Sequence, residues 1–462
     1  MGGVQQTISP VDGRVYAERP FAEAGTIDAT LERAVRAQRA FALTPLAQRA
    51  ACCERFCAAL EARAEEIGGE LTWQMGRPVT QTPGEVKTCV ARARFMIAHA
   101  REGLAPLQPE PEAGFKRYVR RMPLGVVFVI APWNYPFLTA VNTIVPAIMA
   151  GNAVLLKHAA QTQLVAERFA EAFAAAGLPE GVFQYLHIPG PTAEALVRDR
   201  RLAHVAFTGS VPVGHAVNQA AAARFISVGL ELGGKDPAYV RADADIERAA
   251  ETLVDGAFFN SGQSCCAIER IYVHESVHDD FVARAVALTR EYRLGNPTER
   301  DTNLGPVVSA KAAAFIRAQI NEAIAQGASP LIEAGRFAAD TGSGPYLAPQ
   351  ILVNVSHAMR VMTEETFGPV VGIMKVASDE EALRLMNDSP YGLTAALFTR
   401  DLEAAEALGG RIETGTVFMN RCDYLDPALP WTGVKDTGRG HTLSVWGYEH
   451  LTRPQSFHLR VA

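Results

Sequence analysis

Two adjacent cysteines in the segment Asn260-Ser-Gly-Gln-Ser-Cys-Cys266 have a setting suited to chemistry. The segment contains a glycine turn, follows the apolar run 257–259 and precedes a predicted strand. A cysteine on such a loop is suited to act as a nucleophile, because its thiolate is intrinsically reactive. The alternative is that Cys265 and Cys266 are packing residues, since free cysteine is among the residue types most often buried.

A lone carboxylate, Glu231, lies at the end of an apolar strand in the segment Gly229-Leu-Glu-Leu-Gly-Gly-Lys-Asp-Pro237. An unpaired charge is costly in apolar surroundings, so the pKa of such a carboxyl group rises. A glutamate with a raised pKa is a good general base. The alternative is a glutamate that caps a neighbouring backbone turn. Gly233 and Gly234 permit close approach of a ligand to the backbone.

Two further turns carry groups that can bind negative charge. In Ala131-Pro-Trp-Asn-Tyr-Pro136 the two prolines hold a rigid turn, and the amide of Asn134 is suited to donate to a developing oxyanion. The segment Phe207-Thr-Gly-Ser-Val-Pro-Val-Gly214 follows a strand and opens a helix, which aims backbone N–H groups at a phosphate. It matches neither a Walker loop nor Gly-x-Gly-x-x-Gly, so the usual nucleotide-binding patterns do not detect it.

Secondary structure must bring these segments together, and the pattern after Val126 is that of a parallel sheet. Strand-like runs alternate there with helical ones, which is typical of βαβ units. The predicted strands are 126–130, 153–157, 182–187, 204–207 and 226–230. Before them, residues 26 to about 103 have helical periodicity, with breaks near 44–45 and 76–78.

A second alternating series follows Gly234, so the sequence predicts two α/β domains. It contains a helix capped by Asp245, a strand over 270–274, and strands near Val370 and Ala396.

Two segments lie outside both series. They are the basic strand-like stretch 115–122 and the tail after Trp446, which ends in the strand-like residues 456–461. Both are suited to form an arm between subunits.

Composition excludes several classes of protein. With 462 residues, 48% of them hydrophobic, the chain can bury large cores. Its net charge of −6 gives no basic excess for a nucleic acid or an anionic membrane. The N-terminus shows no targeting pattern, and the longest apolar stretches fall short of the ~18 residues of a membrane helix. We therefore expect a cytoplasmic protein that binds a small molecule, without a nucleic-acid or membrane partner.

The seven cysteines are an odd number, which favours reduced thiols over a disulfide framework. Cys52, Cys53 and Cys57 lie in a segment of helical periodicity with no partnering Cys or His cluster. We expect these thiols to pack within a helix, and we expect no metal site.

Taken together and in order, five motifs resemble the aldehyde dehydrogenase superfamily. They are Ala-Pro-Trp-Asn-Tyr-Pro (131–136), Phe-Thr-Gly-Ser (207–210), Glu-Leu-Gly-Gly-Lys (231–235), Gly-Gln-Ser-Cys (262–265) and Glu-Glu-Thr-Phe-Gly-Pro (364–369). The resemblance extends from about Ile27 to the C-terminal strand. The 34 positions between Glu231 and Cys265 (265 minus 231) are also similar to the family's spacing.

The resemblance implies a role for each motif residue. Cys265 corresponds to the nucleophile, Glu231 to the base that activates water, and Asn134, with the Cys265 backbone N–H, to the oxyanion hole. The implied cofactor contacts are Lys157 at the adenosine ribose, Gly209 and Ser210 at the pyrophosphate, Trp133 in the adjoining cleft, and Glu365 and Phe367 at the nicotinamide ribose and ring.

The implied reaction is thiolate attack on an aldehyde, hydride transfer to a nicotinamide and hydrolysis of the resulting thioester. Because Glu231 is present, release of the free acid is favoured over the alternative, transfer of the acyl group to coenzyme A. Two further alternatives are a non-catalytic protein that keeps the fold and a reductase that works on an acyl-CoA or acyl-phosphate.

The sequence departs from the family pattern after Lys157. Relatives that prefer NAD often have Lys-Pro-x-Glu, in which the glutamate binds the adenosine ribose, whereas this chain has Ala160 at that position. Loss of the carboxylate removes an acceptor for NAD and a repulsion against the 2′-phosphate of NADP, and His158 or Lys157 is available to add attraction. The choice between NAD and NADP stays open.

The positions that resemble the family's substrate tunnel are mostly aromatic or polar: Tyr135, Thr139, Asn142, Phe259, Cys266, Asp423, Leu425 and Trp431. Succinic semialdehyde dehydrogenases usually have an arginine where Asn142 falls, so its absence counts against that substrate, with Arg421 as an alternative cation. Asp423, with Tyr135 and Trp431, favours an amino or aromatic aldehyde instead. For each of these residues, simple packing is the competing interpretation.

The implied fold is α/β, with a Rossmann-like NAD(P)-binding domain (1–104 and 124–230), a catalytic domain (231–440) and a small β oligomerisation arm (105–123 and 441–462). An arm that extends a neighbour's sheet predicts a homodimer or homotetramer.

Overall fold

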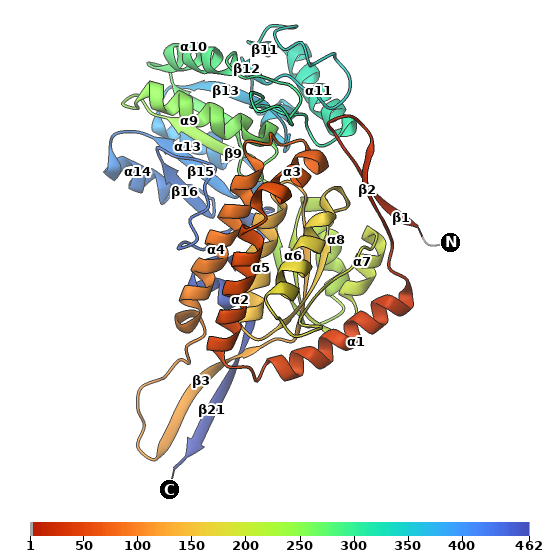
Figure 1. The fold of residues 1–462 in the computed structure, drawn as a ribbon. Coiled ribbons are helices and arrows are strands. Elements are labelled where there is room, and N and C mark those ends of the chain that lie inside the picture. Colours follow the sequence, from red (N-terminus) through yellow and green to blue (C-terminus); the bar gives the residue numbers. More distant parts are fainter. Residues whose placement is uncertain (1–2, 462) are drawn as a thin grey trace.

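The computed structural model describes residues 3–461 and contains two large, mostly parallel sheets (Figure 1). The first has six strands in the order β19-β8-β7-β4-β5-β6, all parallel except β19. These strands are β4 (Val126–Ala131), β5 (Ala153–His158), β6 (Phe183–Tyr185), β7 (Leu202–Thr208), β8 (Ser227–Glu231) and β19 (Gly438–Arg439). All five strands predicted for this part of the chain are confirmed, with ends that differ by at most two residues.

Helices cover both faces of the first sheet, because alternate residues of a strand point to opposite sides. Val127 and Val129 pack against a layer formed by α2 (Leu46–Glu61), α3 (Ala64–Met75), α4 (Thr82–Gly103), α5 (Pro136–Met149) and α6 (Leu164–Ala175). Val126 and Phe128 pack on the other side with α1 (Ala24–Phe41), α7 (Gly190–Val197) and α8 (Val211–Ala221). As expected, Cys52, Cys53 and Cys57 are buried within α2.

The second sheet has seven strands in the order β11-β12-β13-β10-β9-β15-β16, and only β11 is antiparallel to its neighbour. The strands are β9 (Asp236–Val240), β10 (Ile268–His274), β11 (Ser329–Pro330), β12 (Gln350–Val353), β13 (Val370–Val376), β15 (Thr394–Phe398) and β16 (Thr416–Met419). The second series of alternating strands and helices, predicted after Gly234, thus forms a second, separate sheet.

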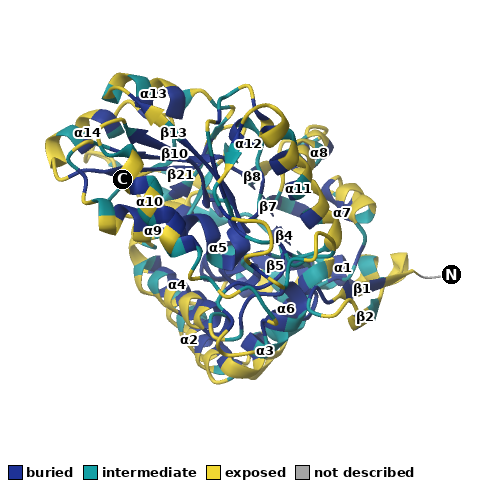
Figure 2. Cartoon of the chain, turned by 90° about the horizontal axis from the view of Figure 1, so that it is seen from above, coloured by how far each residue is buried: buried dark blue, intermediate teal, exposed yellow. Residues whose placement is uncertain are grey.

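Helices also cover the second sheet. On one face lie α9 (Ile246–Phe258) and α10 (His278–Thr289), and on the other α13 (Asp379–Asn387) and α14 (Leu402–Gly409). A separate cluster at the β12 and β13 edge contains α11 (Ala310–Ala325) and α12 (Arg360–Thr363). The Asp245 side chain accepts the N–H of Arg248 and caps α9, as predicted. Seen from above, buried residues concentrate in the sheets and on the inward faces of the helices (Figure 2).

Short elements complete the chain. Single-turn 3₁₀ helices are η1 (Ala160–Thr162), η2 (Phe259–Gly262) and η3 (Val445–Tyr448). Two small antiparallel pairs join β14 (Tyr391–Gly392) to β18 (Val434–Lys435) and β17 (Trp431–Thr432) to β20 (His441–Thr442). No helix among residues 3–461 is both long and apolar enough to cross a membrane.

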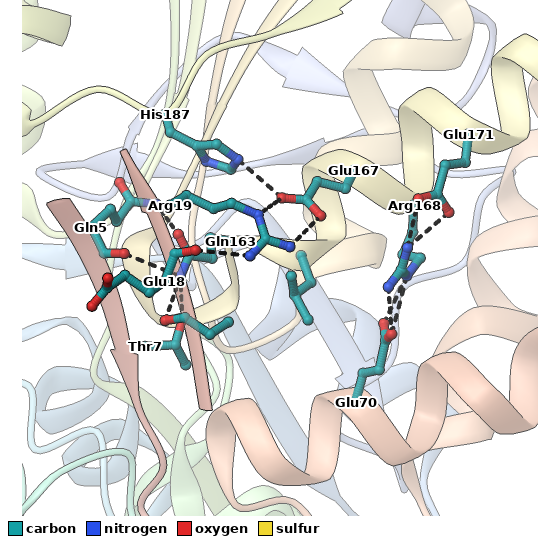
Figure 3. A network of polar contacts seen from close by, with 12 residues as sticks. Gln5, Thr7, Glu18, Arg19, Glu70, Gln163, Glu167, Arg168, Glu171 and His187 are labelled. Carbon is teal, nitrogen blue, oxygen red and sulfur yellow. Dashed lines mark hydrogen bonds and ion pairs between the residues drawn. The ribbon is translucent and has the colours of Figure 1, made fainter. Parts of the chain in front are cut away.

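An N-terminal hairpin of β1 (Val4–Ile8) and β2 (Val15–Pro20) precedes α1, and sequence analysis did not predict it. Its inward side chains are polar: Gln5 and Thr7 are buried and hydrogen bond with Gln163 (Figure 3). Arg19 forms a two-pronged ion pair with Glu167 at 2.6 and 2.9 Å. The hairpin therefore attaches to α6 through hydrogen bonds, and no alternation of apolar residues marks it in the sequence.

The strands β3 (Phe115–Pro123) and β21 (Thr452–Arg460) form an antiparallel two-stranded ribbon that projects from the body (Figure 1). Tyr118 stacks on Phe457 at 4.6 Å across the ribbon. Both strand-like segments that lay outside the two alternating series are thus strands. The residues just before β21 are part of the body, because Tyr448 is fully buried and its hydroxyl donates to the carbonyl of Met96 at 2.6 Å.

Candidate active site

The two sheets meet end to end around one site. The chain runs from β4 to β5 on one side of the first sheet and to β7 and β8 on the other, so the order reverses between β4 and β7. Ligands of open parallel sheets bind in the crevice at such a point, beyond the carboxyl ends of the strands. The segments that follow β4 and β7, the link 232–235 between β8 and β9, and the loops that precede β10 and β13 all contribute residues to this junction. Every predicted motif lies in one of these loops.

Two cavities open at this junction. The first, of about 480 Å³, lies beside the loops after β4 and β7, and the second, of about 600 Å³, lies between α4, α5 and α9. Both share a wall that contains Thr139, Thr208, Glu231, Leu232 and Cys265. A group on this wall can therefore meet one ligand from each side.

Cys265 is half-buried on the loop before β10. Within residues 3–461, its backbone N–H has no hydrogen-bond partner. Asn134 is 5% exposed, and its Nδ2 donates to the carbonyl of Gln263 at 3.2 Å, on the same loop as Cys265. The loop therefore brings an uncommitted backbone donor and the Asn134 amide to the neighbourhood of the thiol.

Cys266 has different surroundings. It is fully buried and lines only the second cavity. Its thiol contacts Asp423 Oδ1 at 2.9 Å, and a hydrogen bond with Cys265, together with burial, raises the pKa of Cys266 well above the usual cysteine value. Cys266 therefore stays a neutral thiol that holds Asp423, a residue whose φ of 45° lies in the left-handed region.

Glu231 ends β8, as the sequence predicts. Its Oε1 accepts the hydroxyl of Thr442 at 2.6 Å, and its Oε2 accepts that of Thr208 at 3.3 Å. Burial raises the pKa of Glu231 above the usual glutamate value, and the two hydroxyl donors oppose that shift only in part. The carboxyl group is thus held at the shared wall, with no ion-pair partner among the described residues.

A buried arginine that sequence analysis missed connects the site loops. Arg77, between α3 and α4, donates to Asn260 Oδ1 at 3.0 Å and to the carbonyl of Asn134 at 2.5 Å. Its third contact is Glu85 at 2.5 Å, whose other oxygen accepts the N–H of Phe137 at 2.9 Å. One side chain therefore fixes the Asn134 turn, the start of α5 and the cysteine loop. In the sequence, Arg77 appears only as part of a helix break.

A second buried pair fixes the loop before β13. Lys235 contacts Glu269, and Glu269 accepts the N–H groups of Thr366 and Phe367 at 2.8 and 2.9 Å. Phe367 has a φ of 53°, which is an unfavourable backbone conformation for this residue type. The contacts with Glu269 hold the loop in that conformation. The ring of Phe367 packs edge-on against that of Trp133, with 5.7 Å between the ring centroids.

The first cavity presents groups that are suited to bind a phosphate. No side chain caps α8 at Ser210, so the first N–H groups of the helix are available to a phosphate. Glu365 accepts the N–H of Gly234 at 3.1 Å, and a Cβ at Gly233 would lie 2.3 Å from the Glu365 oxygens, so a larger residue there would displace the Glu365 carboxylate. Trp133, Gly209, Ser210, Glu365 and Phe367 all line this cavity.

Lys157 and Ala160 lie outside the lining of the first cavity. Lys157 is partly exposed near the end of β5, and burial lowers its pKa. Ala160 is exposed at the start of η1. His158 is not available to a ligand phosphate, because its buried ring lies against the carbonyl of Pro136 and the hydroxyl of Thr162. Burial lowers the pKa of His158 to about 4, so the ring carries no charge near neutral pH.

All the predicted tunnel residues line the second cavity: Tyr135, Thr139, Asn142, Phe259, Cys266, Asp423, Leu425 and Trp431. Arg421, the predicted alternative cation, is exposed and stacks on Tyr424 at 3.3 Å, so it does not enter the cavity. The cation that does line the cavity is Arg92 of α4, which sequence analysis did not identify.

A parallel sheet with an uncapped helix N-terminus at its switch point, joined to a second sheet that presents a cysteine, is an arrangement suited to a dinucleotide-dependent oxidoreductase. The chain belongs to the aldehyde dehydrogenase family, whose sequence model matches residues 2–457.

Relatives agree with this assignment over nearly the whole chain. A succinate-semialdehyde dehydrogenase [NADP(+)] of Mycobacterium tuberculosis (strain ATCC 25618 / H37Rv) is 35% identical over 96% of this chain and 96% of its own length. A succinate semialdehyde dehydrogenase [NAD(P)+] of Escherichia coli (strain K12) is 34% identical over 97% and 96%. The crystal structure of succinic semialdehyde dehydrogenase from Streptococcus pyogenes in complex with NADP+ superimposes with a TM-score of 0.94, at 29% identity over 99% and 100%.

The protein is therefore an enzyme that oxidises an aldehyde with NAD or NADP as cofactor, and its fold is that of the aldehyde dehydrogenases. The predictions of family, fold class, activity and cofactor class are confirmed.

Proposed function

We propose that Cys265 is the nucleophile, that Asn134 and the Cys265 N–H form the oxyanion hole, and that Glu231 is the general base. The shared wall carries this proposal, because Cys265 and Glu231 both line the first and the second cavity. From that position, the thiol can meet an aldehyde in one cavity and a nicotinamide in the other. Cys266 has access to only one cavity.

In the first half of the reaction, the Cys265 thiolate forms a C–S bond to the aldehyde carbon and the carbonyl oxygen becomes an oxyanion. Asn134 Nδ2 and the Cys265 N–H donate to that oxygen, which stabilises the developing charge. NAD(P)+, when bound in the first cavity, supplies the hydride acceptor. Collapse of the oxyanion as the hydride leaves gives a thioester on Cys265.

In the second half, Glu231 takes a proton from a water molecule while the water oxygen forms a bond to the thioester carbon. The C–S bond then breaks, the carboxylic acid leaves and Cys265 returns to the thiolate. Thr442 and Thr208 hold Glu231 at the shared wall, at 2.6 and 3.3 Å. Because the chain provides this base, we propose hydrolysis as the release step, with acyl transfer to coenzyme A as the alternative.

We propose that Trp133, Gly209, Ser210, Glu365 and Phe367 bind the phosphate and nicotinamide portions of the cofactor. Lys157, near the end of β5, and Ala160, just after that strand, are proposed to face the adenosine ribose of the cofactor. The exposed Ala160 presents no carboxylate to a 2′-phosphate, so we propose that the enzyme uses NADP+ as well as NAD+.

The experiment that tests the catalytic assignment is an aldehyde panel, followed through the absorbance of the reduced nicotinamide with NAD+ and NADP+ in parallel. The panel includes aliphatic, aromatic and amino aldehydes. It also includes succinic semialdehyde, because the M. tuberculosis and E. coli relatives are named for that substrate. Cys265→Ala should abolish turnover, whereas Cys266→Ala should retain folding and turnover. Turnover that survives Cys265→Ala contradicts the assignment.

We also propose the domain division 1–104 with 124–230 for the cofactor and 231–440 for catalysis. The sequence predicts an oligomerisation arm of 105–123 with 441–462, but the residues just before β21 pack in the body, so we limit the C-terminal part of the proposed arm to β21. A two-stranded ribbon is marginally stable alone, and its open edges are free to extend a sheet in another subunit. The ribbon of β3 and β21 projects from the body in this way (Figure 1). A homodimer or homotetramer built through this arm is the proposed assembly.

A further inference from the structure

Arg92 is a buried cation without an anion. Its side chain belongs to α4, lines the second cavity and leaves the residue 7% exposed. Its Nη1 donates to the carbonyl of Leu138 at 3.4 Å and to Asn142 Oδ1 at 3.5 Å, both at the long limit of a hydrogen bond. Its Nε is buried and has no partner, and within residues 3–461 no carboxylate lies within 4 Å of the guanidinium.

The two other buried arginines provide a comparison within the same molecule. Arg77 uses all three guanidinium nitrogens, on Asn260, Glu85 and the Asn134 carbonyl. Arg270 also uses all three, with a 2.8 Å bond from Nε to the carbonyl of Lys235. Burial of a guanidinium without such partners is strongly unfavourable. Of the three buried arginines, Arg92 is the one that lines a cavity and the one that has N–H donors without a hydrogen-bond acceptor.

Four acids line the second cavity, and three of them are engaged by other groups. Asp423 accepts hydrogen bonds from Ser264 and Cys266. Glu231 accepts those of Thr442 and Thr208, as described above. Glu251 is exposed and faces Arg284 at 3.4 Å, and Asp255, also exposed, lies on the α9 wall. None of the four is within ion-pair distance of Arg92, so the charge of the guanidinium is available to a ligand.

We propose that Arg92 binds a carboxylate at the far end of the aldehyde substrate, so that the enzyme oxidises short aldehydes with an anionic tail. The inference rests on the proposed function, in which the aldehyde group is held at Cys265. Arg92 contacts Leu138 and Asn142, which lie in the first two turns of α5. Asn134 lies just before α5, so the anion site lies along the helix that follows the proposed oxyanion hole. A guanidinium matches a carboxylate through two parallel hydrogen bonds.

This arrangement changes the meaning of Asn142. Sequence analysis counted the absence of an arginine there against a semialdehyde substrate. The Arg92 guanidinium approaches Asn142 from the neighbouring helix α4 at 3.5 Å, so a cation is present near that position although its source is different. A carboxylate is the preferred anion over a phosphate, because Arg92 is the only cationic residue lining the described cavity and a phosphate dianion calls for more than one.

The test compares succinic semialdehyde with butanal, which has the same chain length and no carboxylate. kcat/KM is measured for the wild type, Arg92→Met and Arg92→Lys, with Arg421→Met as a matched control that removes an exposed arginine beside the tunnel. We expect Arg92→Met to lower kcat/KM for succinic semialdehyde by ~100-fold and that for butanal much less. Arg92→Lys should fall between, since lysine lacks the fork. Arg421→Met should resemble the wild type.

Several outcomes overturn the proposal. An equal loss for both aldehydes in Arg92→Met would make Arg92 a structural residue, and an unchanged preference would exclude it from recognition. A wild-type preference for butanal, 4-aminobutanal or glyceraldehyde 3-phosphate over succinic semialdehyde would also contradict it. If Cys265→Ala retains activity, or no aldehyde is oxidised, the proposed function fails first and for a different reason.

A measurement on the wild type alone keeps the proposal testable if Arg92→Met does not fold. Butyrate should inhibit butanal oxidation competitively and more strongly than the neutral butyramide does, because only butyrate places a carboxylate on Arg92 when its methyl end lies toward Cys265. Equal inhibition by the acid and the amide contradicts the anion site.

Discussion

At the residue scale, the two adjacent thiols show how surroundings divide one residue type between two roles. Cys265 is half-buried and lines both cavities, whereas Cys266 is buried against Asp423 and has its pKa raised. Both thiols line the second cavity but only Cys265 also lines the first, which is why we propose Cys265 and not Cys266 as the nucleophile.

Glu231 should be needed for release of the acid and not for oxidation. In Glu231→Gln we expect a burst of about one reduced nucleotide per site, followed by a steady-state rate lower by ~10²-fold, because the thioester forms but water is no longer activated. Stopped-flow absorbance measures both phases. Absence of the burst would show that Glu231 acts before the thioester, and added coenzyme A that restores turnover would favour the acyl-transfer alternative.

The pH dependence of the same step follows from the environment of Glu231. Its raised pKa means that the carboxylate, which is the active form of a base, appears only as the pH rises through a value above the usual glutamate range. The steady-state rate should therefore fall on the acid side of that pKa, and this limb should be lost in Glu231→Gln. A limb that persists in the variant would assign it to another group.

Ala160 should set the tolerance for the 2′-phosphate. A carboxylate introduced by Ala160→Glu adds an acceptor for the ribose hydroxyls of NAD+ and repels the phosphate of NADP+. We expect the ratio of kcat/KM with NADP+ to that with NAD+ to fall by at least ~10-fold, or about 1.4 kcal/mol. Ala160→Gln is the control, because glutamine has the shape of glutamate without its charge. An equal change of the kcat/KM ratio in both variants would contradict the electrostatic explanation.

At the scale of elements, the junction between α3 and α4 holds the site through Arg77. Arg77→Ala leaves Glu85 buried without its cation and frees both the Asn134 turn and the cysteine loop. We expect a loss of about 3–5 kcal/mol in the free energy of unfolding, measured by denaturant titration, and a reduced kcat in the folded fraction. Arg63→Ala, which removes a partly exposed ion pair with Glu66, should cost less than about 1 kcal/mol. Similar losses in the two variants would argue against this role of Arg77.

The sequence predicted the elements that obey hydrophobic periodicity and missed those with polar interiors. The strand end at Glu231 and the strand-to-helix turn at Ser210 were predicted because apolar strands and glycine turns mark them. The β1–β2 hairpin was missed because its buried residues are Gln5 and Thr7, which show no apolar alternation.

The site was predicted to the extent that its residues lie in compact motifs. Arg77 and Arg92 are far from Cys265 in the sequence and stand in segments that read as a helix break and a helix surface. Only the packing of α4 against α5 reveals that Arg92 faces the tunnel. Contacts of this kind depend on tertiary packing, which no local pattern encodes.

At the scale of the whole molecule, the projecting ribbon should control assembly. Truncation after Thr452 removes β21 and leaves β3 without its only strand neighbour among the described residues. We expect the wild type to be a dimer or tetramer by light scattering at micromolar concentration, and the truncated chain to be smaller. A truncated chain that keeps the wild-type mass would place the interface on another surface.

The link between the two sheets has a consequence for motion. Only the four residues Leu232–Lys235, two of them glycines, separate the end of β8 at Glu231 from the start of β9 at Asp236. The chain crosses between the sheets again from β16 to β19, so the two sheets are tied together at both ends of the catalytic segment. Because Glu231 ends the strand that enters the short link, its backbone is tethered within four residues of the second sheet, which limits how far the carboxyl group can move from the loop that carries Cys265.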